Sequence, residues 1–152
     1  MITKPILIIA GEPYSIFLEI YFKSLRKKKI KNLKNPIILI CSKNLLVKQM
    51  KKLKYKFKIR EVSKSNLDTK KLTNKTINLI NVNFGIKETF DKISSKSKPY
   101  IEDCLNVALS LRSIPNLPTM SPSPPNACGF SIYISIRYGD SKEELISSCQ
   151  IL

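Results

Sequence analysis

Three uncharged apolar runs stand out along the chain, at residues 5–10, 36–41 and 76–82. Runs of this length, rich in Ile and Leu and bounded by turn residues, are typical of strands buried on both faces of a parallel sheet. A fourth segment, 56–60, alternates polar and apolar residues and predicts an edge strand. We expect the three runs to share one sheet, with 5–10 parallel to 36–41.

Between these runs, the apolar residues recur with helical spacing and predict helices. The first predicted helix covers about 14–28, with Ile16, Phe17, Ile20, Tyr21 and Leu25 facing inward. A second covers 43–54, with Ser42 as its N-cap and an apolar face of Leu45, Leu46, Met50 and Leu53. A third begins at Ser97, with apolar residues at 100, 101, 104, 105, 108 and 109. Strands alternating with helices predict an α/β fold with α/β/α layers and a mainly parallel sheet over residues 1–112.

The composition changes after residue 112. Residues 113–128 are rich in Pro and Ser and predict a linker. Residues 130–138 alternate as a strand would, and Asp140 and Ser141 followed by Glu144 resemble a capping box. Residues 129–152 are thus consistent with a small βα unit, or with a foreign or out-of-frame ending on a truncated gene.

The net charge of +16 is carried by the first part of the chain. Residues 1–112 hold 25 Lys and Arg against 8 Asp and Glu, whereas residues 113–152 hold 2 against 3. An AT-rich genome, whose codons favour Lys, Asn and Ile, is one explanation. The cluster from Arg26 to Lys34 is either a solvated helix end whose cations complement the helix dipole, or a weak patch for polyanions.

The cysteines and the hydropathy pattern indicate the cellular compartment in which we expect the protein. No apolar run approaches the about 18 residues that a membrane-spanning helix needs, so no membrane partner is expected. No signal peptide is recognisable. The four cysteines, Cys41, Cys104, Cys128 and Cys149, form no Cys-x-x-Cys pair, which favours reduced thiols in a cytoplasmic protein. Cys41 ends a strand before a helix, where a thiolate would be stabilised, but a buried structural cysteine is the favoured interpretation.

The first apolar run ends in Gly11, Glu12 and Pro13, a turn that delivers the chain to a helix. With Ile16 and Glu19, these residues match the N-terminal signature of the 4-hydroxythreonine-4-phosphate dehydrogenase family, which the chain resembles over about residues 4–112. Tyr14, Ser15, Phe17 and Leu18 depart from that signature, and Ser15 and Phe17 replace family glycines. The resemblance implies the N-terminal part of an isocitrate-dehydrogenase-like fold, incomplete in this chain.

The resemblance also implies a chemistry. The family oxidises a phosphorylated hydroxy-amino acid with NAD in pyridoxal phosphate synthesis, as a homodimer whose divalent metal is bound by three histidines contributed across the dimer. This chain has no histidine, and the family's Gly-His-Thr segment is missing after residue 112. The metal site can therefore be carried over onto no position here, no catalytic residue is assigned, and the cofactor-binding residues stay unknown. The family's NAD and metal are supported by no residue of this chain.

Glu12 and Glu19 are the only pair of carboxylates near a predicted strand end, and helix capping by Glu12 is favoured over acid–base chemistry. Two functions follow. The first is a truncated or degenerate member of the dehydrogenase family that is inactive alone. The alternative is a basic α/β binding module for polyanions such as nucleic acid.

Overall fold

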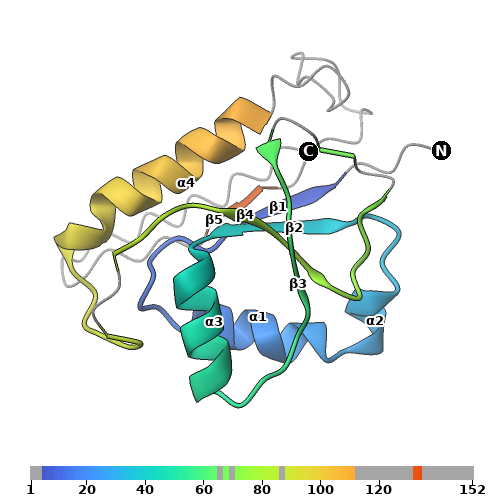
Figure 1. Ribbon diagram of the computed structural model, residues 1–152, viewed down its shortest axis with the longest axis horizontal. Helices are drawn as coiled ribbons and strands as arrows, with labels where there is room; N and C mark the ends of the chain where they lie inside the picture. Colours follow the sequence, from blue (N-terminus) through green and yellow to red (C-terminus); the bar gives the residue numbers. More distant parts are fainter. Residues whose placement is uncertain (1–4, 65–66, 69–70, 86–87, 112–131, 135–152) are drawn as a thin grey trace.

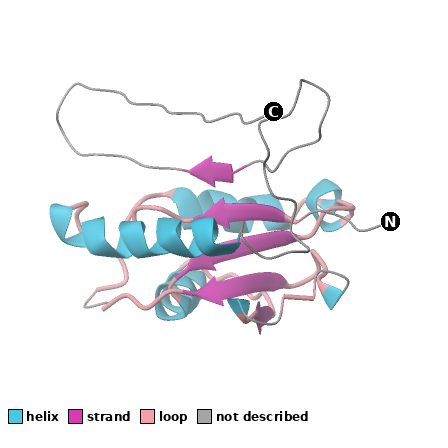
Figure 2. Ribbon diagram, turned by 90° about the horizontal axis from the view of Figure 1, so that it is seen from above, coloured by secondary structure: helices cyan, strands magenta, loops and turns pink. Residues whose placement is uncertain are grey.

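The apolar runs form neighbouring parallel strands, as the sequence predicts. The computed structural model describes residues 5–64, 67–68, 71–85, 88–111 and 132–134. Its strands are β1 (Ile6–Ile9), β2 (Ile37–Cys41), β3 (Ile59–Glu61), β4 (Ile77–Asn81) and β5 (Ile132–Ile134). The sheet order is β3-β4-β2-β1-β5, every pairing is parallel, and Figure 2 shows the arrows running in one direction. Where β1 pairs with β2, Ile6 lies opposite Ile37.

Helices cover both faces of this sheet. They are α1 (Phe17–Leu25), α2 (Lys28–Lys31), α3 (Lys43–Lys52) and α4 (Lys98–Leu111), with a 3-10 turn η3 (Ser95–Ser97) before α4. In Figure 1, α1 and α3 lie on one side of the sheet and α4 lies on the other. Buried side chains of α1 and α3 cluster with one set of strand residues, and those of α4 cluster with another. The expected α/β/α layering with a parallel sheet is confirmed.

The inward face of α1 differs from the prediction. Ile16 and Ile20 are 60% and 52% exposed, whereas Leu18 and Phe22 are 2% and 0% exposed. The buried positions Leu18, Tyr21, Phe22 and Leu25 form their own helical stripe, which is turned relative to the predicted one. The prediction was wrong for Ile16 and Ile20 because α1 offers two apolar stripes, and only one faces the sheet. Leu109 of α4 is likewise exposed, and Val107 and Leu111 are buried instead.

Two local predictions are confirmed. The Ser42 side chain caps α3, where its Oγ accepts a hydrogen bond from the Leu45 amide at 3.4 Å. Leu45 and Leu46 are buried beneath it, as the spacing predicts. The edge strand expected at 56–60 is present at one edge of the sheet with shifted bounds, because β3 covers Ile59–Glu61 and residues 56–58 precede it.

Two buried asparagines hold the end of the sheet where β2 begins. The Asn74 Oδ1 accepts a hydrogen bond from the Ile37 amide at 2.8 Å, and its Nδ2 donates to the Leu33 and Asn35 carbonyls at 3.1 and 3.0 Å. The Asn78 Nδ2 donates to the Ile37 carbonyl at 2.8 Å. These side chains satisfy backbone groups that would otherwise be buried without partners.

Several sequence predictions lie outside the described residues. The linker at 113–128 and all of 129–152 except β5 belong to this part. β5 falls within the alternating stretch 130–138, and it pairs with β1 at the other edge of the sheet. Within the described ranges, no helix combines the length and the apolar character needed to cross a membrane.

Candidate functional site

The turn between β1 and α1 is the first candidate, because ligand sites of parallel α/β sheets lie beyond the carboxyl ends of the strands. Gly11 has a φ of 65°, a left-handed conformation that favours glycine. The Ser15 amide and hydroxyl both donate to the Glu12 carbonyl, at 3.2 and 2.9 Å. The Ser15 Oγ in turn accepts from the Phe17 amide at 3.3 Å, where α1 begins. Gly11 and Ser15 therefore fix the shape of this turn.

The Glu12 side chain points into the protein rather than into solvent. It is 4% exposed, and its Oε1 accepts hydrogen bonds from the Ser97 hydroxyl at 2.9 Å and the Tyr14 amide at 3.5 Å. Burial raises the pKa of the Glu12 carboxyl above its ordinary value, while the hydrogen bonds from Ser97 and Tyr14 act in the opposite direction. Glu12 thus joins the turn after β1 to the start of α4.

The residues of the family signature do not come together around one centre. Gly11, Glu12 and Pro13 lie in the turn, whereas Ile16 is exposed at the start of α1. The Glu19 carboxylate forms a surface ion pair with Lys23 on the same helix, with an O–N distance of 2.6 Å. Glu12 is buried and hydrogen-bonded to Ser97 instead, so these two carboxylates do not act as a pair.

Gln49 is a residue of this region that sequence reasoning missed. It is 1% exposed, and its Nε2 donates to the Pro13 carbonyl at 3.0 Å and the Thr89 carbonyl at 3.2 Å. Gln49 therefore ties the turn to α3 and to the segment that follows β4. The available signal was its spacing of four residues from Leu45, which places both side chains on one helix face.

A backbone amide at the start of α3 also has its hydrogen-bond partner within the protein. The Ser42 amide donates to the Tyr100 hydroxyl at 2.9 Å, and Tyr100 is 3% exposed. The Tyr100 ring lies against Phe84 with ring centres 4.7 Å apart, and Phe84 contacts Tyr14 at 6.0 Å. This backbone amide is therefore not offered to a ligand.

Cys41 is fully buried at the end of β2, as the favoured interpretation expects. Burial raises the pKa of the Cys41 thiol well above its usual value, and it raises the pKa of the Cys104 thiol to about 11. Both cysteines are free. Because the thiolate is the reactive form, neither is an activated nucleophile at neutral pH.

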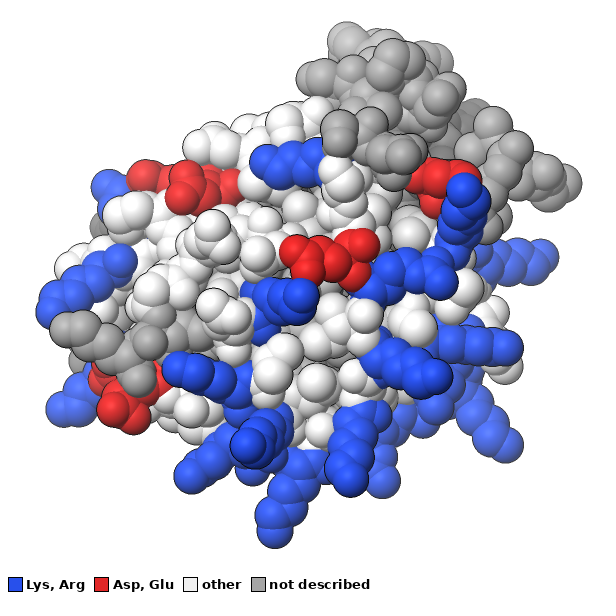
Figure 3. Space-filling model, viewed as in Figure 1, with Lys and Arg blue, Asp and Glu red and all other residues white. Residues whose placement is uncertain are grey.

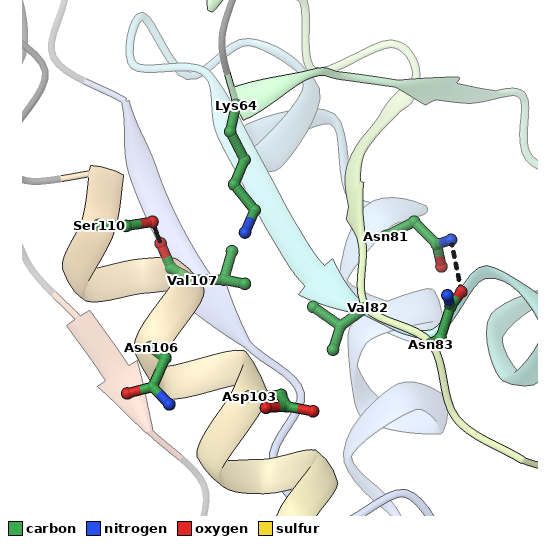
Figure 4. A pocket seen from close by; sticks show the side chains of 8 residues that line it. All are labelled: Lys64, Asn81, Val82, Asn83, Asp103, Asn106, Val107 and Ser110. Atoms are coloured by element: carbon green, nitrogen blue, oxygen red, sulfur yellow. Dashed lines mark hydrogen bonds between the residues drawn. The ribbon is translucent and has the colours of Figure 1, made fainter.

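A second candidate is a hollow of about 430 Å³ between α4 and the segments that follow β3 and β4. Its lining residues are mostly polar: Lys64, Asn81, Val82, Asn83, Asp103, Asn106, Val107 and Ser110. In Figure 4, Lys64 extends toward α4 from one side, while Asn81, the last residue of β4, and Asn83 lie beside each other. The Asn81 Nδ2 donates to the Asn83 Oδ1 at 3.3 Å. No motif in the sequence pointed to this hollow.

The chemistry available in the hollow is limited to hydrogen bonding and single charges. Asn81, Asn83 and Asn106 supply amides, and Asp103 supplies the one carboxylate among its lining residues. Over the ranges that the structure describes, no group of three or more His, Cys, Asp or Glu side chains could hold a metal ion. The residues present do not fit the divalent metal of the dehydrogenase family, which needs about three protein ligands.

Comparison with known proteins gives a match at the level of the fold. No family model matches the sequence, and no curated protein matches it. The fold matches the crystal structure of a 4-hydroxythreonine-4-phosphate dehydrogenase from Burkholderia phymatum with a TM-score of 0.62 and 17% sequence identity. The match covers 77% of this chain and 35% of that chain. The chain thus has the fold of one portion of that dehydrogenase, and the resemblance drawn from Gly11, Glu12 and Pro13 is confirmed at the level of the fold.

Proposed function

We propose that this chain is a degenerate counterpart of one portion of a 4-hydroxythreonine-4-phosphate dehydrogenase, and that alone it does not oxidise the family's substrate. The observation that supports this most strongly is the position of the Glu12 side chain. The carboxylate of the matching signature is buried and hydrogen-bonded to Ser97. A group in this position holds two elements together and is out of reach of a substrate in solvent.

The side chains around Glu12 support the same proposal. The hydrogen bonds of Gln49 and Tyr100 are made within the protein, to Pro13, Thr89 and Ser42. The resemblance implies that three histidines hold the family's metal, and this chain contains no histidine. Among the residues that the structure describes, no cluster of Cys, Asp or Glu could take their place. What remains is a scaffold whose fold matches one portion of the enzyme.

Formation of NADH tests the proposal. The purified chain, at a concentration comparable to that of the substrate, is mixed with NAD and 4-phosphohydroxy-L-threonine, with zinc, magnesium or cobalt added in turn. We expect no NADH above the metal-free blank, because a catalytic metal needs about three protein ligands and an open position. The Burkholderia phymatum enzyme under the same conditions is the positive control. Turnover that requires a metal and is lost on chelation would contradict the proposal.

A further inference from the structure

One continuous segment carries nearly all of the net charge. Residues 20–60 contain 15 Lys and Arg and no Asp or Glu, whereas the rest of the chain contains 12 Lys and Arg against 11 Asp and Glu. A codon bias toward lysine acts on the whole gene and does not exclude acidic residues from one segment. The concentration of charge in residues 20–60 therefore calls for an explanation in the structure.

Most of these cations are free to meet a partner. Lys23 pairs with Glu19, Lys43 pairs with Glu61, and the Arg60 guanidinium donates to the Lys71 carbonyl. The other twelve are exposed, and within the described residues none forms an ion pair with a carboxylate. They are Arg26, Lys27, Lys28, Lys29, Lys31, Lys34, Lys48, Lys51, Lys52, Lys54, Lys56 and Lys58, and we call them the lysine face.

The fold gathers the lysine face on one side of the molecule. Its residues come from the end of α1, from α2, from the outer side of α3 and from the segment before β3. These elements lie on the side of the sheet opposite α4 (Figure 1). Figure 3 shows Lys and Arg side chains crowding this lower part of the molecule, with most Asp and Glu above or to the left. Such a field attracts a polyanion and costs the fold some self-repulsion.

The positions of the aromatic residues in this region distinguish between single-stranded and double-stranded nucleic acid as the partner. In the segment 54–58, Lys54, Lys56 and Lys58 are exposed, whereas Tyr55 and Phe57 alternate with them and turn inward. The Tyr55 and Phe57 rings stack at 5.8 Å, and Phe57 lies 6.1 Å from the buried Phe22. Single-stranded nucleic acids are bound through bases stacked on exposed aromatic rings. Here the Tyr55 and Phe57 rings are partly buried against the core, and the lysines between them are the exposed side chains of the segment.

We infer that the lysine face binds the phosphate backbone of double-stranded nucleic acid without reading its sequence. Lysine is a point charge suited to phosphate. Sequence is read by side chains such as Arg, Lys, Asn and Gln that are placed against base edges in a groove, and nothing in the lysine face is built to enter one. Arg26 is the only arginine of the lysine face. Binding of this kind is dominated by counterion release and weakens steeply as salt is raised. This activity is separate from the proposed relation to the dehydrogenase and stands or falls independently of it.

Fluorescence anisotropy of a labelled duplex DNA, titrated with the full chain at several salt concentrations, tests the inference. The test variant is Lys51→Gln, Lys52→Gln and Lys54→Gln together. The matched control is Lys75→Gln, Lys92→Gln and Lys96→Gln, which removes the same charge from exposed positions outside residues 20–60. We expect the test variant to lose at least about tenfold in affinity at low salt, with a salt slope flatter by about 2–3, since each phosphate contact contributes about 0.9. The control should stay within about threefold of the wild type.

The competing explanations give different results. Equal losses in both variants would mean that net charge alone governs binding, as a codon bias would produce, and would overturn the inference. Tighter binding to single-stranded than to duplex DNA would overturn the duplex assignment. Binding to poly-glutamate or to phosphatidylserine vesicles as tight as to duplex would also overturn it, because the partner would then be any acidic surface. Circular dichroism of both variants verifies that they are folded before binding is compared.

Discussion

Replacing Phe22 with alanine should lower the free energy of unfolding by about 3–5 kcal/mol, the usual cost of removing a buried phenyl ring. Phe22 is fully buried in the layer between α1 and the sheet. Its ring lies 5.4 Å from Tyr55 and 6.1 Å from Phe57, and pairs of this kind add about 0.5–1.5 kcal/mol beyond the area they bury. The cavity left by the ring would also loosen the segment that carries Lys54, Lys56 and Lys58.

Urea unfolding followed by circular dichroism measures this loss. Phe90→Ala is the matched control, because Phe90 is 46% exposed and its truncation should change the free energy of unfolding by about 0.5 kcal/mol or less. A loss below about 1 kcal/mol for Phe22→Ala would mean that α1 does not pack on the sheet as described.

Asn74→Ala should destabilise the protein by about 2–4 kcal/mol, although it removes no apolar contact of note. The change deletes the acceptor for the Ile37 amide and the donors to the Leu33 and Asn35 carbonyls. Each net hydrogen bond contributes about 0.5–1.5 kcal/mol, and a buried donor left unpaired costs about 1–3 kcal/mol. The Ile37 amide lies at the start of β2, so the loss falls on the central strands.

The same urea experiment with Asn44→Ala provides the comparison. Asn44 is exposed on α3, and its replacement should change the free energy of unfolding by no more than about 0.5 kcal/mol in either direction. If Asn74→Ala and Asn44→Ala behave alike, the Asn74 side chain is not the link between the β2 start and the preceding loop.

The strands were predictable because a strand that is buried on both faces needs apolar residues at consecutive positions, and this pattern is visible in the local sequence. Ile37–Cys41 is buried at every position, and an uninterrupted apolar run is what such a strand requires. The Ser42 cap was predictable for a similar reason, since its partner, the Leu45 amide, is three residues away.

Other features depend on partners that the sequence does not bring near. The Asn74 side chain binds backbone groups 37 to 41 residues away, and Gln49 reaches Pro13 across 36 residues. No periodicity marks such pairs. The orientation of α1 was ambiguous for another reason, because Ile16 and Ile20 are as apolar as Leu18 and Phe22 and equally spaced. The hollow lined by Lys64, Asn81 and Asp103 likewise exists only once the segments after β3 and β4 meet α4.

We propose that the carboxylate of the family signature, Glu12, serves the fold and not a reaction. Glu12 is buried against Ser97, and burial raises its pKa because the ionised form is poorly solvated there. A carboxylate that takes part in binding metal, cofactor or substrate would change its environment when these are added.

The ¹³C chemical shift of the Glu12 carboxyl carbon, followed through a pH titration, tests this most directly. The signal is assigned by its absence in Glu12→Gln, and the titration is repeated with NAD, 4-phosphohydroxy-L-threonine and zinc or magnesium added together. We expect a single titration with a pKa above the ordinary glutamate value, and the same curve with and without the additions. A Glu12 signal or pKa that moves when they are added would contradict it.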